Sequence, residues 1–232
     1  MCSSDLDMKL KGIIFDMDGV LLDTERVYFQ CWKQSAQDFG FSMADETALA
    51  VRSCCQTYAE PFLKRVMGED FDYLAVRNHR RKLVSAYLAE HGISQKPGIR
   101  PLLDYCRENG LIAAVATATA RSLAEERLES AGLGGLFPHI VGGNQVKTGK
   151  PEPEIYRTAA AQLGLEPEAC AAVEDSPNGI IAAFSAGCRP LMVPDLTQPD
   201  AFLQPLLAGT APDLEQLIPV IQHLEEGELC HA

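Results

Sequence analysis

From residue 97 onward, short apolar runs alternate with helical patterns, and this order leaves few folds open. The runs are residues 111–116, 140–141, 169–173 and 191–193. Helical patterns lie between and after them, at residues 99–109, 121–131, 153–163, 177–187 and 214–224. Strand–helix–strand units of this kind build a parallel sheet with helices on both faces. The chain is therefore predicted to be an α/β protein with a Rossmann-like sheet.

An all-helical stretch interrupts this order after the first strand. Residues 10–15 (LKGIIF) predict that strand, and Thr24 is placed to cap a helix over residues 25–39. From residue 43 to residue 90 the apolar positions recur at helical spacing, without strand-like alternation. We therefore expect a core domain of residues 1–23 and 95–232, and a helical domain of residues 24–94 inserted into it.

The composition excludes several classes of protein. The chain has 232 residues, of which 47% are hydrophobic, and a formal net charge of −12. This charge argues against a nucleic-acid partner, which calls for a basic face, but a locally positive site can still bind a small anion. No apolar run approaches the ~20 residues of a membrane-crossing helix. The first ten residues lack the basic flank and apolar stretch of a signal peptide.

The cysteines indicate a reducing compartment. The eight cysteines include no Cys-x-x-Cys pair, and no secretory signal accompanies them. We therefore expect reduced thiols in a cytoplasmic protein. The adjacent Cys54 and Cys55 allow a redox interpretation, but neighbouring side chains on a helix point in different directions.

Polar residues follow the predicted strands at their carboxyl ends or in the loops beyond. They are Asp16, Asp18, Thr117, Thr119, Lys150, Glu174 and Asp175. Ligands of open α/β sheets bind beyond the carboxyl ends of the strands, so these side chains should meet at one edge. Crowded carboxylates call for a cation, and a site made only of oxygen ligands suits Mg²⁺. A lysine beside such a site suits phosphoryl transfer, and an aspartate can itself be the attacking group.

Four segments carry a family resemblance. Residues 16–24 (DMDGVLLDT), 115–119 (VATAT), 149–156 (GKPEPEIY) and 173–180 (VEDSPNGI) resemble the four motifs of the haloacid dehalogenase (HAD) superfamily, in the same order. The helical stretch after the first motif is similar to the small helical cap of that superfamily. Within it, the chain most resembles the β-phosphoglucomutase-like and sugar-phosphate phosphatase members.

The resemblance implies a Mg²⁺-dependent phosphatase acting on a small phosphorylated metabolite. Asp16 would be the nucleophile and a Mg²⁺ ligand, and Asp18 the general acid/base with its backbone carbonyl on the metal. Asp175 would be a further Mg²⁺ ligand, with Glu174 beside it as a direct ligand or as its partner. The cap would close over the substrate and exclude water.

The phosphate group would be held by the second and third motifs. The resemblance assigns this role to Thr117, Ala118 and Lys150. A threonine after a strand can also cap the next helix, and Thr119 is the alternative for that role. Residues 174–176 are likewise suited to cap the helix that begins at Pro177.

Two other functions stay open. In a phosphomutase of the β-phosphoglucomutase kind, the first cap helix carries a histidine, and a Gly-x-Ser-Arg segment follows; here Tyr28 and residues 52–56 (RSCCQ) stand in those places. Arg52 could replace the missing arginine, but its register differs. A non-catalytic binding module on the same fold is the second alternative. Asp18 argues against a haloacid dehalogenase, which does not keep the second aspartate of this motif.

Three features of the helical stretch have no role fixed by the motifs. Tyr28 and Trp32 lie four residues apart on one helix face; such aromatic pairs usually belong to a core, although Tyr28 could face the cleft. Residues 77–82 (RNHRRK) are predicted to be a solvated helix face.

Overall fold

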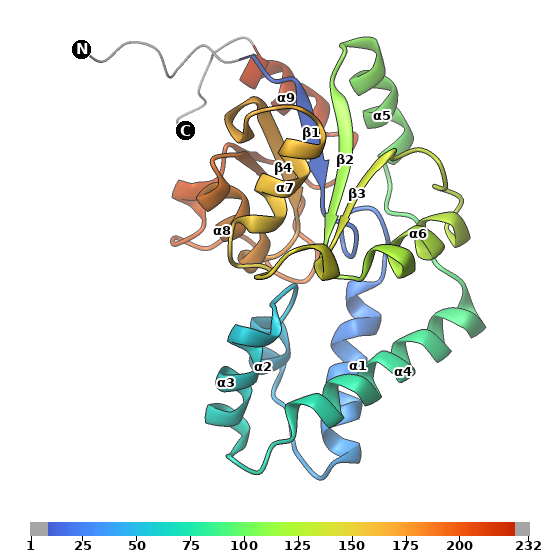
Figure 1. Ribbon diagram of the computed structural model, residues 1–232, viewed down its shortest axis with the longest axis vertical. Helices are drawn as coiled ribbons and strands as arrows, with labels where there is room; N and C mark the ends of the chain where they lie inside the picture. The colour runs from blue at the N-terminus through green and yellow to red at the C-terminus, as the bar shows by residue number, and fades with distance from the viewer. Residues whose placement is uncertain (1–8, 226–232) are drawn as a thin grey trace.

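The computed structural model describes residues 9–225, which form a six-stranded sheet with helices on both faces (Figure 1). The strands are β1 (Gly12–Phe15), β2 (Ile112–Thr117), β3 (His139–Gly142), β4 (Cys170–Glu174), β5 (Arg189–Met192) and β6 (Gly209–Thr210). They lie in the order β3-β2-β1-β4-β5-β6, and all neighbours are parallel. This confirms the predicted α/β fold. The two-residue strand β6 was not predicted.

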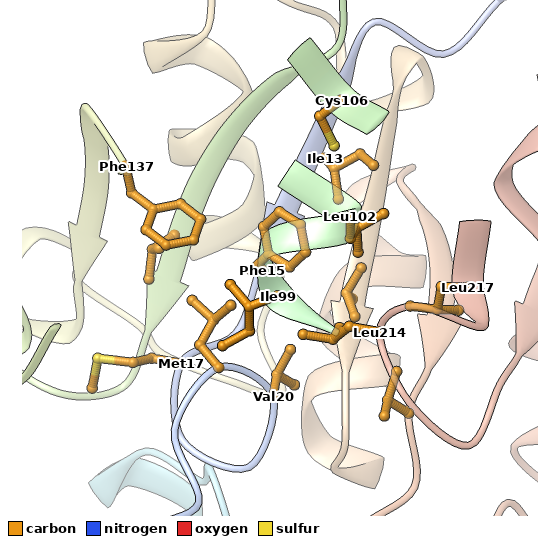
Figure 2. Packing of buried hydrophobic residues seen from close by; sticks show 14 of the residues in the cluster. Ile13, Phe15, Met17, Val20, Ile99, Leu102, Cys106, Phe137, Leu214 and Leu217 are labelled. Carbon is orange, nitrogen blue, oxygen red and sulfur yellow. The ribbon is translucent and has the colours of Figure 1, made fainter. Parts of the chain in front are cut away.

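Five α-helices cover the two faces of the sheet. They are α5 (Ile99–Glu108), α6 (Arg121–Ser130), α7 (Glu154–Gln162), α8 (Pro177–Ala186) and α9 (Leu217–Glu225). Side chains of β1 alternate between the faces: Ile13 and Phe15 pack with α5, α6 and α9, and Ile14 packs with α7 and α8. Figure 2 shows the first of these cores, where the rings of Phe15 and Phe137 meet edge to face at 5.8 Å.

Four more helices lie between β1 and α5 in the chain, and we call them the helical insert. They are α1 (Glu25–Asp38), α2 (Asp45–Ala50), α3 (Gln56–Met67) and α4 (Tyr73–His91). They gather beyond one edge of the sheet, where α1 and α4 lie side by side (Figure 1). Trp32, Leu63 and Phe71 belong to an apolar cluster within the insert.

The chain leaves the sheet and returns to it at one place. The N–H of Asp23 donates to the carbonyl of Ser94 at 2.9 Å, and the N–H of Lys96 donates to the carbonyl of Leu21 at 2.9 Å. The two connections to the insert are therefore paired by backbone hydrogen bonds, next to the loop that follows β1.

Three short 3-10 helices also lie within residues 9–225: η1 (Gly143–Gln145), η2 (Pro167–Ala169) and η3 (Gln204–Leu206). No helix within residues 9–225 is long and apolar enough to cross a membrane. The cysteines in the described part of the chain are free thiols; Cys2 and Cys230 lie outside it.

Candidate active site

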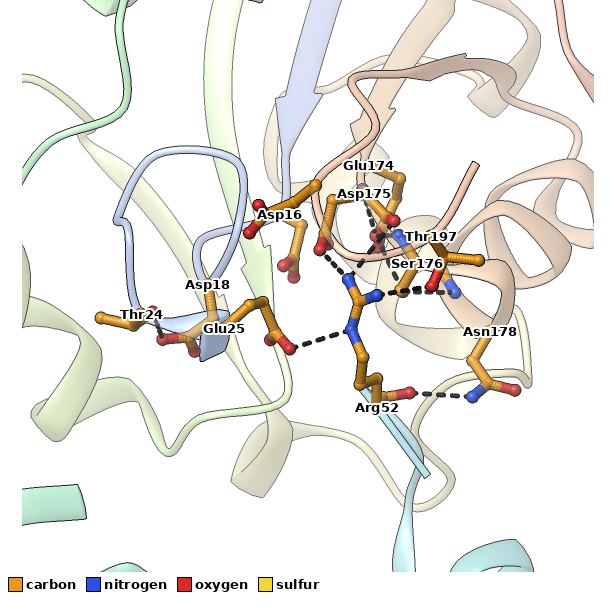
Figure 3. Close-up of polar contacts among 12 residues, drawn as sticks. Asp16, Asp18, Thr24, Glu25, Arg52, Glu174, Asp175, Ser176, Asn178 and Thr197 are labelled. Atoms are coloured by element: carbon orange, nitrogen blue, oxygen red, sulfur yellow. Dashed lines mark hydrogen bonds and ion pairs between the residues drawn. The ribbon is translucent and has the colours of Figure 1, made fainter. Parts of the chain in front are cut away.

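The residues that follow the strands meet at one edge of the sheet. The first strand ends at Phe15, whose neighbours across the sheet are Val115 and Val173, so the segments after these strands lie together. All five central side chains are buried: Asp16, Thr117, Lys150, Glu174 and Asp175. Figure 3 shows several of them in a polar cluster with residues of the insert. The edge therefore combines four carboxylates, counting Asp18, with a lysine.

The loop after β1 is compact because of its glycine. The N–H groups of Leu21 and Leu22 both donate to the carbonyl of Met17, which closes a tight turn. Gly19 has a φ of +90°, and a Cβ atom there would lie 2.4 Å from a carboxylate oxygen of Asp175. Glycine therefore lets this loop approach the end of β4 closely.

Lys150 joins two of the carboxylates. Its Nζ donates to Asp16 Oδ1 at 2.5 Å, to Glu174 Oε1 at 2.5 Å and to the carbonyl of Ala116 at 3.2 Å. Burial alone would lower the pKa of Lys150, but the two carboxylates outweigh burial and raise it. The lysine is therefore a fixed positive charge beside Asp16.

Glu174 holds this lysine in place. Its Oε1 also accepts from the hydroxyl of Tyr156 at 2.5 Å, and its Oε2 accepts from the hydroxyl of Ser176 at 3.2 Å and the N–H of Asp175 at 3.2 Å. Both oxygens already have donors, which favours the role of a partner over that of a direct metal ligand. The hydroxyl of Ser176 also accepts from the N–H of Gly179 at 3.1 Å, so Ser176 caps α8.

The carboxylates of Asp16 and Asp175 fit a divalent cation. Ligand atoms of Asp16, Glu174 and Asp175 lie within 4.8 Å of one another. Asp16 Oδ2 and Asp175 Oδ1 are buried and have no hydrogen-bond partner among the described residues. Burial raises the pKa of both carboxyl groups, and neighbouring carboxylates add to the rise. Buried oxygens without donors are costly, and a hard cation would satisfy them.

Asp18 lies apart from that cluster, although only one residue separates it from Asp16 in sequence. Its Oδ1 accepts from the hydroxyl of Thr24 at 2.6 Å, and its Oδ2 accepts from the hydroxyl of Thr119 at 3.1 Å. Arg127 Nη1 lies 3.6 Å from Oδ1. Thr24 stands at the N-cap position of α1, as predicted, but its side chain makes no capping hydrogen bond and donates to Asp18 instead.

The segment after β2 forms a turn held by its own side chains. Thr117 Oγ1 accepts from the N–H of Thr119 at 3.1 Å. Neither threonine caps α6, because the residue at its start is Ala120 and the N–H of Arg121 donates to Asn144 Oδ1 at 2.9 Å. The hydroxyl of Thr119 is thereby left to bind Asp18.

Comparison with known proteins agrees with this geometry. A family model described as haloacid dehalogenase-like hydrolase matches residues 10–187. The chain belongs to this family. It is 34% identical to phosphorylated carbohydrates phosphatase of Thermotoga maritima over 77% of the chain and 82% of that protein. It is 32% identical to hexitol phosphatase A of Escherichia coli K12, covering 80% and 84%.

One solved structure has a similar fold along nearly the whole chain. A HAD family hydrolase from Deinococcus radiodurans R1, solved with bound phosphate and sodium, superposes with a TM-score of 0.69 at 26% identity. The match covers 97% of this chain and 100% of that one. The resemblance inferred from the four motifs is therefore confirmed for the family and for the fold.

Arg52 brings the insert into the site of this HAD-like hydrolase, which the sequence did not predict. Its Nε donates to Glu25 Oε2 at 3.0 Å, its Nη1 donates to Thr197 Oγ1 at 2.8 Å, and its Nη2 binds Asp175 Oδ2 (Figure 3). Burial raises the pKa of Glu25 to about 7, although Arg52 opposes the rise. Arg52 lies in the loop between α2 and α3, and its guanidinium is occupied by Glu25, Thr197 and Asp175.

A cavity of about 300 Å³ lies between the insert and the segment after β2. Tyr28 lines it, and the hydroxyl of Tyr28 accepts a hydrogen bond from Arg127. Trp32 is buried in the insert and forms part of the wall. The prediction of a solvated face over residues 77–82 is wrong in part, because all three of its arginines, Arg77, Arg80 and Arg81, line this cavity.

Proposed function

We propose that the protein hydrolyses the phosphate monoester of a small phosphorylated metabolite, such as a sugar phosphate, through an aspartyl-phosphate on Asp16. The observation that carries this proposal is the difference between two carboxylates of one motif. Asp16 is bound by Lys150 and keeps one oxygen without a donor, whereas Asp18 is held by two hydroxyl groups. Carboxylates in such different surroundings are suited to different roles.

In the first step a carboxylate oxygen of Asp16 attacks phosphorus, and the bond from phosphorus to the leaving oxygen breaks. Asp18 gives its proton to that oxygen. In the second step Asp18 takes a proton from a water molecule, which attacks the phosphorus. The bond from phosphorus to the Asp16 oxygen breaks, so that inorganic phosphate leaves and the Asp16 carboxylate is restored. The hydroxyl groups of Thr24 and Thr119 hold the Asp18 carboxylate in one orientation for both transfers.

The phosphoryl oxygens would be held by Lys150, Thr117 and the backbone at Ala118. Asp16 and Asp175 would hold Mg²⁺ through their free oxygens, with the backbone carbonyl of Asp18. When bound, Mg²⁺ neutralises charge on the phosphate group. Glu174 keeps Lys150 beside Asp16.

The helical insert would exclude water from this chemistry. We propose that residues 24–94 form a cap domain that closes over the substrate. Contacts between Arg52 of the insert and Asp175 of the sheet support this placement. The cytoplasmic location and the lack of a nucleic-acid partner stay predictions from the sequence.

Hydrolysis is favoured over a mutase reaction. A mutase has to shield its aspartyl-phosphate from water until the sugar returns, and the resemblance gives this family's mutases a cap histidine. Tyr28 stands at that position with its hydroxyl bound to Arg127, and no histidine is among the described residues that line the cavity.

The test incubates the protein and Mg²⁺ with a panel of sugar phosphates, phosphoglycolate and nucleotides. It measures the inorganic phosphate released and the ester consumed. For at least one ester we expect the two amounts to be equal. Asp16→Asn should release none, and Asp70→Asn, at an exposed position, should match the unchanged protein. Conversion of one sugar phosphate into another without release would favour the mutase. Release by Asp16→Asn at the normal rate would overturn the proposal.

A further inference from the structure

Helix α4 presents three arginines to the cavity at helical spacing. Arg77, Arg80 and Arg81 are three and four residues apart, so they share one face, and all line the cavity. Ala118 and Thr119, which follow β2, line the same cavity. We call the three arginines the arginine triad. One cavity therefore joins the segment expected to hold the scissile phosphate to this triad.

The described part of the chain provides no partner of opposite charge for the triad. Within residues 9–225 none of its members forms an ion pair, whereas Arg52 and Arg127, which line the same cavity, both lie beside carboxylates. The Nε of Arg80 is buried and has no hydrogen-bond acceptor in the described part of the chain. Burying a donor without an acceptor is costly, so the Nε of Arg80 calls for an oxygen ligand, and Arg77 and Arg81 add positive charge beside it.

Aromatic rings hold two of the guanidinium groups in position. Arg80 lies over the ring of Trp32 at 4.3 Å and over that of Tyr28 at 5.2 Å, and Arg77 lies 6.0 Å from the ring centre of Tyr73. Stacking fixes the plane of a guanidinium and leaves the N–H groups at its edge available. The donors are therefore arranged before any ligand binds.

We infer that the arginine triad binds a second anionic group of the substrate, a carboxylate or a second phosphate, while the scissile phosphate lies at Asp16. This inference rests on the proposed function. Planar guanidinium groups bind both kinds of oxyanion with paired hydrogen bonds, so the shared chemistry is recognition of an oxyanion. The preferred substrates would then be phosphate monoesters with two negatively charged ends.

Two pairs of substrates show the effect of the second anionic group, because the members of each pair differ mainly in that group. Glycerol 3-phosphate and 3-phosphoglycerate differ by a carboxylate, and fructose 6-phosphate and fructose 1,6-bisphosphate differ by a phosphate. In at least one pair, we expect a kcat/KM at least about tenfold higher for the member with the second anion. The pair that shows the preference tells whether the ligand is a carboxylate or a phosphate.

The variants test whether the triad causes that preference. Arg77→Gln and Arg81→Gln should each lower the ratio of the two kcat/KM values about tenfold, mainly through KM. Lys82→Gln removes the same charge from an exposed position of α4 that does not line the cavity, and it should keep the ratio of the unchanged protein. Equal kcat/KM values within both pairs, or a ratio unchanged in both arginine variants, would overturn the inference.

A binding measurement keeps this inference separate from the proposed function. If no ester is hydrolysed, the proposed function fails, and titration calorimetry with 3-phosphoglycerate and fructose 1,6-bisphosphate tests the triad alone. Binding by the unchanged protein that is weakened about tenfold in Arg81→Gln would support the triad. Absence of binding, or binding that is the same in Arg81→Gln, would overturn it.

Discussion

At the scale of single residues, the carboxylates of Glu25 and Asp175 share the guanidinium of Arg52. Arg52 binds both carboxylates in the interior, and neither has another ion-pair partner among the described residues. Three buried carboxyl groups, those of Asp16, Glu25 and Asp175, have a pKa raised by burial. A buried cluster of this kind ties the stability of the protein to pH.

We predict that stability falls with rising pH when metal is removed. The pKa of Glu25 is raised from 4.5 to about 7, so between these values the folded chain keeps a proton that the unfolded chain has released. The unfolded state binds fewer protons there, so the free energy of unfolding falls as pH rises toward 7. In Glu25→Gln this fall should be smaller by on the order of 3 kcal/mol, because a pKa difference of one corresponds to about 1.4 kcal/mol. Urea unfolding in EDTA at a series of pH values measures it.

Glu69→Gln, at an exposed position, is the control for this experiment and should keep the full slope. A slope that is the same in Glu25→Gln as in the unchanged protein would show that Glu25 does not titrate in this range.

The loss of rate caused by replacing Asp18 should depend on the leaving group of the substrate. An aryl phosphate has a good leaving group and needs little protonation, whereas an alkyl phosphate needs a proton. Asp18→Asn should therefore lose about 10²–10⁴-fold with the alkyl ester and clearly less with the aryl ester in the first step. Rapid-quench measurement of that step with both esters tests this, and equal losses would remove Asp18 from the role of general acid.

Single residues also mark the limit of what the sequence predicts. Asp16, Lys150 and Asp175 were expected together because the strand ends of a parallel sheet share one edge. Arg52 could not be placed, because the path of the loop between α2 and α3 depends on how the insert packs on the sheet. Its backbone carbonyl accepts from Asn178 at 2.8 Å, a contact between segments far apart in sequence.

At the scale of elements, the start of α8 approaches the end of β4 closely. Gly179 lies in the first turn of α8, and a Cβ atom there would lie 1.9 Å from the carboxylate of Glu174. The helix can therefore begin beside the site only with glycine at this position.

Gly179→Ala should destabilise the protein. Alanine in place of glycine within a helix usually stabilises by about 1 kcal/mol, but here the methyl group would displace Glu174, and we expect a loss of about 1–3 kcal/mol. Lys150 loses its support, so kcat should fall as well. Chemical unfolding measures the change. The control is Ser185→Ala, at an exposed position of α8, which should change stability by less than about 0.5 kcal/mol. If the two variants changed stability equally, the expected clash between the added methyl group and Glu174 would be contradicted.

Most elements were predictable, and the exceptions have physical causes. Helix α1 was expected over residues 25–39 and spans Glu25–Asp38, because its pattern is amphipathic and ends at a glycine. Strand β6 has two residues, too few for a pattern. Residues 77–82 form a helix as expected, but charge alone does not tell whether a helix face meets water or a cavity beside another element.

At the scale of the whole molecule, the candidate site lies between the sheet and the helical insert. The sheet contributes Asp16 and Asp175, and the insert contributes Arg52 and the arginine triad. The paired backbone of residues 21–23 and 94–96 connects the two parts. The insert lies beyond the carboxyl ends of the strands (Figure 1), and the proposed function depends on this placement.

Metal removal should abolish activity and lower stability. The free oxygens of Asp16 and Asp175 are the expected ligands, so Mg²⁺ at about 100 times its Kd should stabilise the protein by about 2.7 kcal/mol. This gain in stability should disappear in Asp175→Asn. Ca²⁺ should inhibit phosphate release, because its coordination does not keep the octahedral geometry of Mg²⁺. Thermal unfolding and phosphate release with and without EDTA measure both effects. Full turnover in excess chelator would contradict the metal site.

The most direct test follows phosphate onto Asp16. The protein is mixed with an aryl phosphate and Mg²⁺, quenched in acid within milliseconds, and digested for peptide mass spectrometry. We predict phosphate on the Asp16 side chain, formed before inorganic phosphate appears, and none in Asp16→Asn. Phosphate on another residue, or hydrolysis at the normal rate without any phosphorylated peptide, would contradict the account.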